Sequence, residues 1–148
     1  TVQKEVAQRL VSKPGSRDYG LLSVLLGTRA QVELRMDVDR SRFRPSPRVD
    51  SAVIEIDIAR APVVCIHDPR SFERLVRAAF SQRRKMLRNS LKALFTSTEA
   101  VAHEWIDTAA ESAGIDLSRR AETMSIQEFA TFSNNLFPSR TIAAEGTT

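Results

Sequence analysis

The stretch that decides the fold is Gln31-Val32-Glu33-Leu34-Arg35-Met36-Asp37-Val38. It alternates polar and apolar residues with a period of two, the pattern typical of a half-buried strand. A second apolar run with strand character, Val49 to Ile58, follows after a connector at 39–48 that contains Pro45 and Pro47. The sequence therefore predicts two neighbouring strands, which we expect to be antiparallel.

Helical patterns lie on both sides of this strand pair. Before it, Lys4 to Val11 has helical spacing and ends at the stop signals Lys13-Pro14-Gly15-Ser16. The run from Tyr19 to Leu26 is almost uniformly apolar and rich in leucine, which favours a buried helix. After Ala61-Pro62 the pattern becomes helical, so we place a domain boundary there.

Helix start and stop signals recur through residues 62–137. Asp68 and Pro69 suit the N-cap and first position of one helix, and Thr98 can cap another that Gly114 ends. A capping box, Ser125-Ile126-Gln127-Glu128, opens the last helix. The side chains expected to face the core are Phe72, Leu75, Val76, Ala79, Phe80, Leu87, Leu91, Leu94, Phe95, Val101, Trp105, Ala109, Ile126, Phe129 and Leu136.

These patterns predict an α+β chain in three parts. Residues 1–61 combine helices with the strand pair, residues 62–137 form a small all-α domain, and residues 138–148 are a flexible tail of small and polar residues. Without a preceding sheet, the strand pair would leave an unpaired edge and bare apolar faces, so we expect self-association there.

Composition narrows the class of protein. The chain has 148 residues, 42% of them hydrophobic, which is enough for a real core. Its one cysteine, Cys65, excludes an internal disulfide. No apolar run approaches a membrane span and no targeting signal is visible, so we expect a cytosolic protein without a membrane partner. The chain opens in patterned sequence without an initiator methionine, and we expect it to be part of something longer.

The strongest chemical signal is the basic segment Ser81 to Lys92, which holds five cations and no acid. Arg84, Arg88 and Lys92 recur at a spacing of four, so on one helix they would form a cationic ridge suited to phosphate groups. The alternative is a solvated helix face. Such faces normally mix charges of both signs, and we therefore favour RNA contact.

The connector between the strands gives a second signal. Arg40, Arg42, Arg44 and Arg48 surround Phe43 in a stretch stiffened by two prolines. An exposed aromatic ring between cations can stack on an unpaired base while the cations hold the flanking phosphates. Phe43 could equally be a core residue that caps the sheet edge, and spacing leaves the two interpretations even.

Other chemistry finds little support. His67 and His103 lack metal-ligand spacing to each other or to Cys65, so we expect no metal site. The glycines stand too far apart for a phosphate loop, and no complete catalytic constellation is present. Tyr19 and Trp105 are expected in the core.

Several separate motifs, in order along almost the whole chain, resemble the ribosomal-RNA adenine dimethyltransferase family. They are Gln3-Lys4-Glu5-Val6-Ala7-Gln8-Arg9, Tyr19-Gly20-Leu21-Leu22-Ser23-Val24, Phe43-Arg44-Pro45-Ser46-Pro47-Arg48-Val49-Asp50-Ser51-Ala52-Val53, Ala79-Phe80-Ser81-Gln82-Arg83-Arg84-Lys85-Met86-Leu87-Arg88-Asn89 and Arg120-Ala121-Glu122-Thr123-Met124-Ser125 with Phe129. Two departures, Met86 for a usual Thr and Leu26-Gly27 for a common Val-Gln, are expected to change packing more than chemistry.

The resemblance implies an enzyme that transfers methyl groups from S-adenosylmethionine to two adjacent adenosines near the end of small-subunit ribosomal RNA. Residues 1–61 resemble the last part of a Rossmann-like methyltransferase sheet, and residues 62–137 resemble the helical domain that follows it. The family's glycine-rich donor site, its acidic ribose-binding residue and its Asn-Leu-Pro-Tyr catalytic motif would lie upstream. We therefore expect this chain alone to be inactive and to bind no cofactor.

The resemblance also assigns site residues. Phe43 matches the aromatic thought to stack on the flipped target adenine. The basic segment resembles the family's surface for small-subunit rRNA, and the small ribosomal subunit is the implied partner. The expected RNA-binding residues are Arg42, Arg44, Arg48, Arg83, Arg84, Lys85, Arg88, Asn89 and Lys92. Erythromycin-resistance methyltransferases resemble only the methyltransferase part, and mitochondrial relatives with a transcription role fit the same charge and size.

Overall fold

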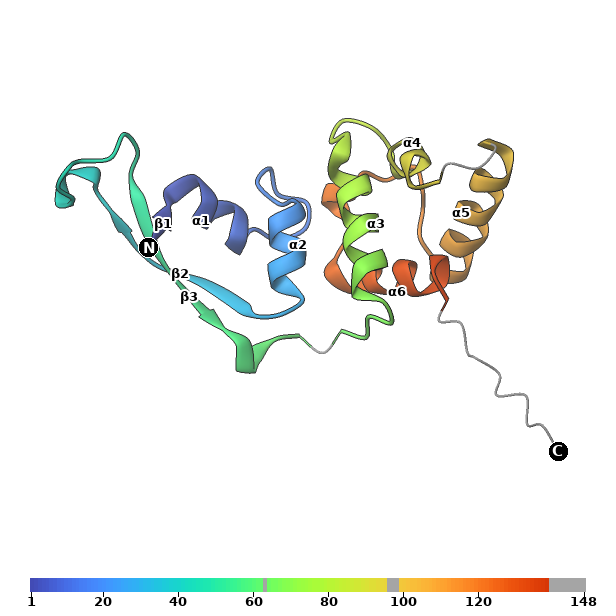
Figure 1. The fold of residues 1–148 in the computed structure, drawn as a ribbon, viewed down its shortest axis with the longest axis horizontal. Helices are drawn as coiled ribbons and strands as arrows, with labels where there is room; N and C mark the ends of the chain where they lie inside the picture. Colours follow the sequence, from blue (N-terminus) through green and yellow to red (C-terminus); the bar gives the residue numbers. More distant parts are fainter. Residues whose placement is uncertain (63, 96–98, 139–148) are drawn as a thin grey trace.

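The computed structural model describes residues 1–62, 64–95 and 99–138. Its N-terminal part holds a three-stranded antiparallel sheet in the order β1-β3-β2. Helices α1 and α2 lie on one side of this sheet (Figure 1). The elements are β1 (Val2–Gln3), α1 (Lys4–Val11), α2 (Leu21–Gly27), β2 (Gln31–Val38) and β3 (Ser51–Asp57). The predicted pair of antiparallel strands is confirmed, and the chain is of mixed α+β class.

The pairing of β2 with β3 gives the sheet two different faces. Val32 lies opposite Ile56 and Leu34 opposite Ile54, so these apolar side chains share a face. The register shifts between Leu34 and Met36, which leaves an extra residue in β2 at that point. Arg35, at this irregularity, forms ion pairs with Glu33 at 3.2 Å and with Glu55. One face of the strand pair is therefore apolar. The ion pairs of Arg35 with Glu33 and Glu55 link charged side chains of the two strands.

Strand β3 ends earlier than the apolar run in the sequence. The Asp57 carboxylate accepts a hydrogen bond from the Ala59 amide at 3.0 Å, which turns the chain into the 3₁₀ turn Ile58–Arg60. Ile58, expected at the end of the strand, is 75% exposed. An Asp two residues from the amide that it bonds is a local turn signal that outweighs the apolar pattern here.

The helical part contains α3 (Pro69–Ser81), α4 (Leu87–Ser90), α5 (Glu99–Ala113) and α6 (Ile126–Leu136), with 3₁₀ turns at Leu91–Leu94 and Ala121–Thr123. The predicted caps are confirmed where they fall on described residues. Asp68 accepts from the Arg70 amide at 3.0 Å, and Gly114 ends α5 with φ of +68°. Thr98 and residues 139–148 of the predicted tail at 138–148 lie outside the described residues.

The core of the helical part is built mainly from α3, α5 and α6, with Leu87 from α4. Its largest fully buried side chains there include Leu75, Leu87, Phe129, Phe132 and Leu136. Trp105 was expected in this core, and that prediction is wrong, because its side chain is 51% exposed. Its indole N–H donates to the Leu136 carbonyl at 2.9 Å, which fixes the ring at the rim of α5 and α6.

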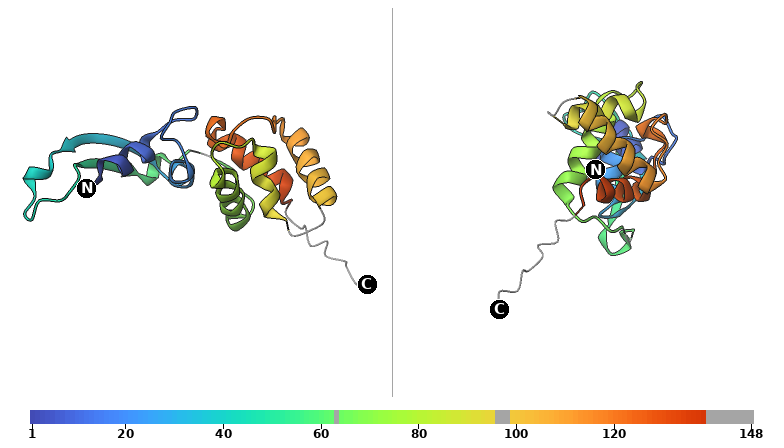
Figure 2. Two further views of the ribbon diagram at one scale, coloured as in Figure 1. Left: turned by 90° about the horizontal axis from the view of Figure 1, so that it is seen from above. Right: turned by 90° about the vertical axis from the view of Figure 1, so that its right-hand side faces the viewer.

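The two parts, whose ribbons form two lobes in the left view of Figure 2, share a continuous core. Tyr19 lies before α2 and is only 1% exposed, so its predicted burial is confirmed, although it lies outside the helix. Its ring meets the Phe80 ring edge-on at 6.1 Å, and Phe80 lies 5.8 Å from Phe129. Tyr19 therefore links the N-terminal part to α3 and α6.

Gly27 makes a second close approach between the two parts. A Cβ atom at this position would lie 2.5 Å from Ile126 Cδ1, at the start of α6. The absence of a side chain at residue 27 thus lets the end of α2 rest directly on Ile126. This contact fits the expectation that the glycine departure affects packing.

Within the residues that the structure describes, no helix has both the length and the apolar character that crossing a membrane would require.

Candidate nucleic-acid interface

The basic segment does not form one helix, so the predicted ridge of Arg84, Arg88 and Lys92 is wrong as a geometry. Helix α3 ends at Ser81, a turn occupies 82–86, and α4 begins at Leu87. The Lys85 amide donates to the Gln82 carbonyl at 2.8 Å and closes the turn. The segment then forms hydrogen bonds with a loop distant in the sequence: the amides of Leu87 and Arg88 donate to the carbonyls of Arg119 and Leu117.

The turn nevertheless presents cations to solvent. Arg83, Arg84 and Lys85 are all exposed. Arg83 donates to Glu122 Oε2 at 3.2 Å, whereas the described residues offer Arg84 and Lys85 no ion-pair partner. Two adjacent unneutralised cations on a tight turn are suited to phosphate oxygens.

Beyond the turn, the remaining predicted residues have other surroundings. Arg88 Nη1 lies 2.8 Å from Asp107 Oδ1 and ties α4 to α5, so this arginine has a structural partner as well as an exposed face. Asn89 is exposed on α4, and Lys92 is exposed on the 3₁₀ turn Leu91–Leu94. The basic segment therefore contains two kinds of cation: Arg84 and Lys85 on a solvent-facing turn, and Arg88, which pairs with Asp107.

The connector between β2 and β3 forms the second candidate surface. It begins with a 3₁₀ turn, Arg40–Arg42, whose start is fixed by Asp39 accepting from the Ser41 amide at 2.8 Å. Hydrogen bonds from Ser41 hold the pKa of the Asp39 carboxyl below its usual value. The Asp50 carboxylate accepts from the Arg40 amide at 3.1 Å, and the Ser46 hydroxyl donates to the Arg40 carbonyl at 2.9 Å. These bonds give the connector a defined shape.

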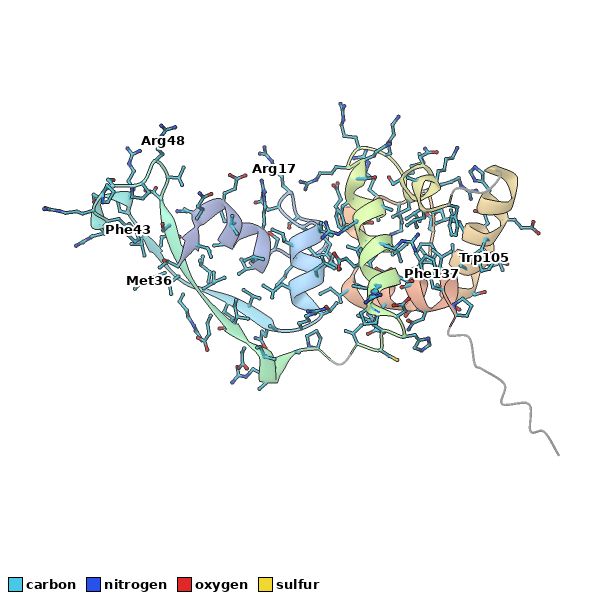
Figure 3. All side chains as sticks on the ribbon, viewed as in Figure 1. Arg17, Met36, Phe43, Arg48, Trp105 and Phe137 are labelled. Atoms are coloured by element: carbon cyan, nitrogen blue, oxygen red, sulfur yellow. The ribbon has the colours of Figure 1, made fainter. Side chains whose placement is uncertain are left out.

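Phe43 directly follows this turn and is partly exposed. It is absent from the buried core, so the structure does not support a core role for it. Arg42, Arg44 and Arg48 are exposed, and none has an ion pair with another described residue. Figure 3 shows Phe43 and Arg48 together at the far end of the strand pair. An aromatic ring and three available cations therefore share one projecting connector.

The structure does not bring the two surfaces into contact. The connector lies at one end of the molecule, and the turn after α3 lies on the helical part (Figure 1). In Figure 3, however, the side chains of Arg48 and Arg17 extend to the same side of the molecule as that turn. Arg17 was not among the predicted residues, and neither were the exposed Lys13 and Arg120. Lys13 and Arg17 flank Pro14-Gly15, a turn signal between two cations that could have indicated them.

Potential metal ligands are dispersed in the part of the chain that the structure describes. No group of three or more His, Cys, Asp or Glu side chains there could hold a metal ion. The glycines at 15, 20, 27 and 114 belong to separate turns and helix ends, and no pair of them forms a phosphate-binding loop. The available chemistry is that of cations and one aromatic ring.

The sequence of residues 1–136 matches the family described as ribosomal RNA adenine dimethylase. The chain belongs to this family. Among its relatives, a ribosomal RNA small subunit methyltransferase A from Myxococcus xanthus is 44% identical over 138 residues, which are 93% of this chain and 48% of the relative. One of the same description from Magnetococcus marinus is 43% identical over 92% of this chain and 46% of its own length. The chain thus spans about half the length of these relatives.

Two solved structures share the fold. A dimethyladenosine transferase from Plasmodium falciparum superposes with a TM-score of 0.70 at 19% identity, over 88% of this chain and 53% of its own. The 23S rRNA methyltransferase ErmE superposes with a TM-score of 0.54 at 21% identity, over 90% of this chain and 52% of its own. The sheet and helices of this chain therefore follow an arrangement seen in these two solved structures.

Proposed function

We propose that this chain is the distal half of a small-subunit rRNA adenine dimethyltransferase and supplies its RNA-binding surface. The relatives carry the name ribosomal RNA small subunit methyltransferase A, and the chain matches about half of each. In the intact enzyme, methyl groups would pass from S-adenosylmethionine to two adjacent adenosines near the end of the rRNA. This chain would hold the RNA and the target base, and the remaining half would hold the donor.

The assignment to the distal half follows from the resemblance, in which the donor and catalytic motifs lie upstream, and the open edge of the sheet agrees with it. Residues 1–61 would be the end of a Rossmann-like sheet and 62–137 the helical domain that follows it. In support, β1 pairs with β3 only at Ser51 and Ala52, so the rest of this edge of β3 has no neighbouring strand among the described residues. Further strands of a larger sheet would fit along this edge.

Phe43 is proposed as the stacking platform for the flipped adenine, with Arg42, Arg44 and Arg48 on the adjacent phosphates. The observation that carries this role is a partly exposed ring on a braced connector among arginines without ion-pair partners in the described chain. Flipping a base costs a few kcal/mol, and stacking on an aromatic ring returns part of that cost. The connector would therefore position a base and not only attract RNA.

The donor site is proposed to lie outside this chain. The described residues hold no glycine-rich loop with an acidic partner, and cations predominate among the exposed charged groups of both candidate surfaces. We therefore expect the 148-residue chain to bind RNA without turning over S-adenosylmethionine.

Two measurements on the chain test the proposal that it binds RNA but not the methyl donor. RNA binding, followed by fluorescence anisotropy, should weaken steeply as salt rises. Titration with S-adenosylmethionine in a calorimeter should give no saturable heat. A defined donor site, or RNA affinity independent of salt, would contradict the proposal.

A fluorescent adenine analogue at the target position of the RNA tests Phe43 separately. Phe43→Ala should abolish the emission change caused by stacking while weakening RNA binding only a few-fold, since phosphate contacts remain. Phe43→Tyr keeps a ring and serves as the matched control. Equal losses of stacking signal and affinity in Phe43→Ala would show that Phe43 acts only by shaping the connector.

A further inference from the structure

We infer that the loop Lys13–Arg17 is a further RNA-contact segment, which joins the turn Arg84-Lys85 and Arg120 in one phosphate-binding surface across the junction of the two parts. This inference rests on the proposed RNA-binding function and extends it to residues of the N-terminal part. RNA bound here would touch both parts of the chain at once.

The loop is attached directly to the helical part beside the basic turn. The Gly15 amide donates to the Glu122 carbonyl at 2.7 Å. Glu122 also receives the side chain of Arg83 at 3.2 Å, so the loop, the 3₁₀ turn Ala121–Thr123 and the basic turn meet at one residue. Gly15 has φ of +85°, a conformation that other residues rarely adopt, which explains why glycine makes this contact.

A second attachment holds the other end of the loop. Tyr19 follows Arg17 by two positions and is buried against Phe80. Phe80 lies in the last turn of α3, only four residues before Arg84. Arg17 therefore lies between two residues, Gly15 and Tyr19, that contact the helical part. These contacts hold the backbone of the loop close to the turn that carries Arg84.

The charges of this surface are available for a ligand. Lys13, Arg17, Arg84, Lys85 and Arg120 are exposed, and none forms an ion pair with any residue that the structure describes. The neighbouring carboxylates already have partners, since Glu122 pairs with Arg83 and Glu128 with Arg119. Asp18, next to Arg17, is an exposed acid, but the five cations still give this surface a strong positive charge.

A nucleic-acid backbone is the polyanion that suits this arrangement. The cations come from three separate segments, so they form an area and not a single pocket, and the exposed apolar side chain beside them is Met86. Repeated phosphates satisfy such an area by charge alone and carry no sequence information. We therefore assign the surface to positioning of the RNA, with base recognition left to Phe43.

The test compares three double variants of the 148-residue chain, with a fluorescein-labelled rRNA hairpin that carries a single-stranded 3′ flank as probe. Lys13→Glu/Arg17→Glu should weaken binding by about tenfold and lower the slope of log affinity against log salt by about 0.7 to 0.9 for each lost phosphate contact. Arg84→Glu/Lys85→Glu provides the reference for the basic turn. Arg29→Glu/Arg70→Glu changes the same net charge at exposed positions outside the proposed surface.

Each outcome has a distinct meaning. Weakening by the loop and turn pairs, with the Arg29 and Arg70 pair close to unchanged, supports the inference. Weakening by the turn pair alone overturns it and leaves the proposed function intact. If all three pairs weaken binding alike, only net charge matters and the inference also fails. If none weakens binding, the proposed RNA surface itself is wrong.

A milder pair guards against misfolding. Lys13→Gln/Arg17→Gln removes the charges without adding acids, and circular dichroism checks that its helix content is unchanged. It should lower affinity about half as far on a logarithmic scale as the glutamate pair, because it removes attraction and adds no repulsion. A folded glutamine pair with unchanged affinity and salt slope would overturn the inference.

Discussion

Glu128 combines two roles in one side chain. It completes the capping box of α6 by accepting from the Ser125 amide at 2.8 Å, and it pairs with Arg119 at 2.6 Å. The hydrogen bond and charge of Arg119 hold the pKa of the Glu128 carboxyl below its ordinary value. The folded state therefore favours the ionised form of this side chain.

Glu128→Gln should separate the two roles, because glutamine can still cap the helix but cannot pair with Arg119. Since the pKa is lowered on folding, the ion pair stabilises the chain above the unfolded value of about 4.3 and is lost as pH falls through the folded value. The side chain is partly exposed, so we expect the variant to lose less than about 1 kcal/mol near neutral pH and nothing at strongly acid pH.

Urea unfolding at several pH values checks this prediction. Glu111→Gln, an exposed carboxylate on α5, is the control. A loss for Glu128→Gln that stays constant from neutral to strongly acid pH would mean that the ion pair with Arg119 contributes nothing.

Tyr19 has a buried hydroxyl group with no hydrogen-bond partner among the described residues. Burial raises the pKa of this phenol far above its ordinary value, because the charged form would be desolvated. Removing an unpaired buried hydroxyl relieves a desolvation cost. Tyr19→Phe should therefore leave the free energy of unfolding unchanged or raise it by up to about 1 kcal/mol. A clear loss of stability in denaturant unfolding would show that the hydroxyl has a partner.

At the scale of elements, the helix ends are where local sequence acts most directly. Gly114 ends α5 with φ of +68°, and a Cβ at this position would meet no atom within 4 Å. Any cost of Gly114→Ala is therefore one of backbone conformation. We expect a loss of about 1 kcal/mol, since non-glycine residues pay this much in the left-handed region.

Gly20→Ala offers the matched comparison for thermal unfolding. Its added Cβ also meets no atom within 4 Å, and its φ of −167° is open to any residue. This variant should lose only a few tenths of a kcal/mol, from the weaker N-cap. Equal losses at the two glycines would argue against a conformational origin of the Gly114 effect.

The elements also show which features the sequence could predict. The strand pair, the caps at Asp68 and Ser125 and the stop at Gly114 follow from neighbours within a few residues, and they were predicted with small errors at the ends. The break between α3 and α4 depends on bonds from Leu87 and Arg88 to carbonyls about thirty residues away. A periodic pattern of cations could not reveal those bonds.

The candidate site divides in the same way. The chemistry of Phe43 and its arginines could be predicted because it belongs to one short connector. The gathering of Lys13 and Arg17 beside Arg84 could not, because it depends on the contact of Gly15 with Glu122 across more than a hundred residues. For Arg88 the sequence suggested an unpaired cation, because its own segment contains no acid. The fold pairs it with Asp107, which lies on a different helix.

At the scale of the whole molecule, the sheet is incompletely covered. Leu34 is 45% exposed and Ile56 is 47% exposed, and the pairing of the strands places their side chains on the same face of the sheet. Beside them runs the edge of β3 that β1 covers only at its start. Apolar surface next to open strand edge favours association between chains.

We expect the chain to self-associate as its concentration rises, and Leu34→Ser/Ile56→Ser to shift it toward the monomer. Sedimentation velocity over a dilution series measures this shift. Leu22→Ser removes a side chain of similar exposure, 46%, from α2 and should leave the association unchanged. A monomer at every concentration for the unaltered chain would rule out the open sheet as an interface.

The position of Tyr19 has a further, practical consequence. The chain contains one tyrosine and one tryptophan, and they stand in different places: Tyr19 at the junction and Trp105 at the rim of α5 and α6. Ultraviolet absorption of the phenol and fluorescence of the indole are thus two built-in optical signals, each from a single residue. After a jump to alkaline pH, the rate at which the buried Tyr19 phenol ionises would report how often the junction opens. Trp105 fluorescence would report in the same experiment whether α5 and α6 remain folded.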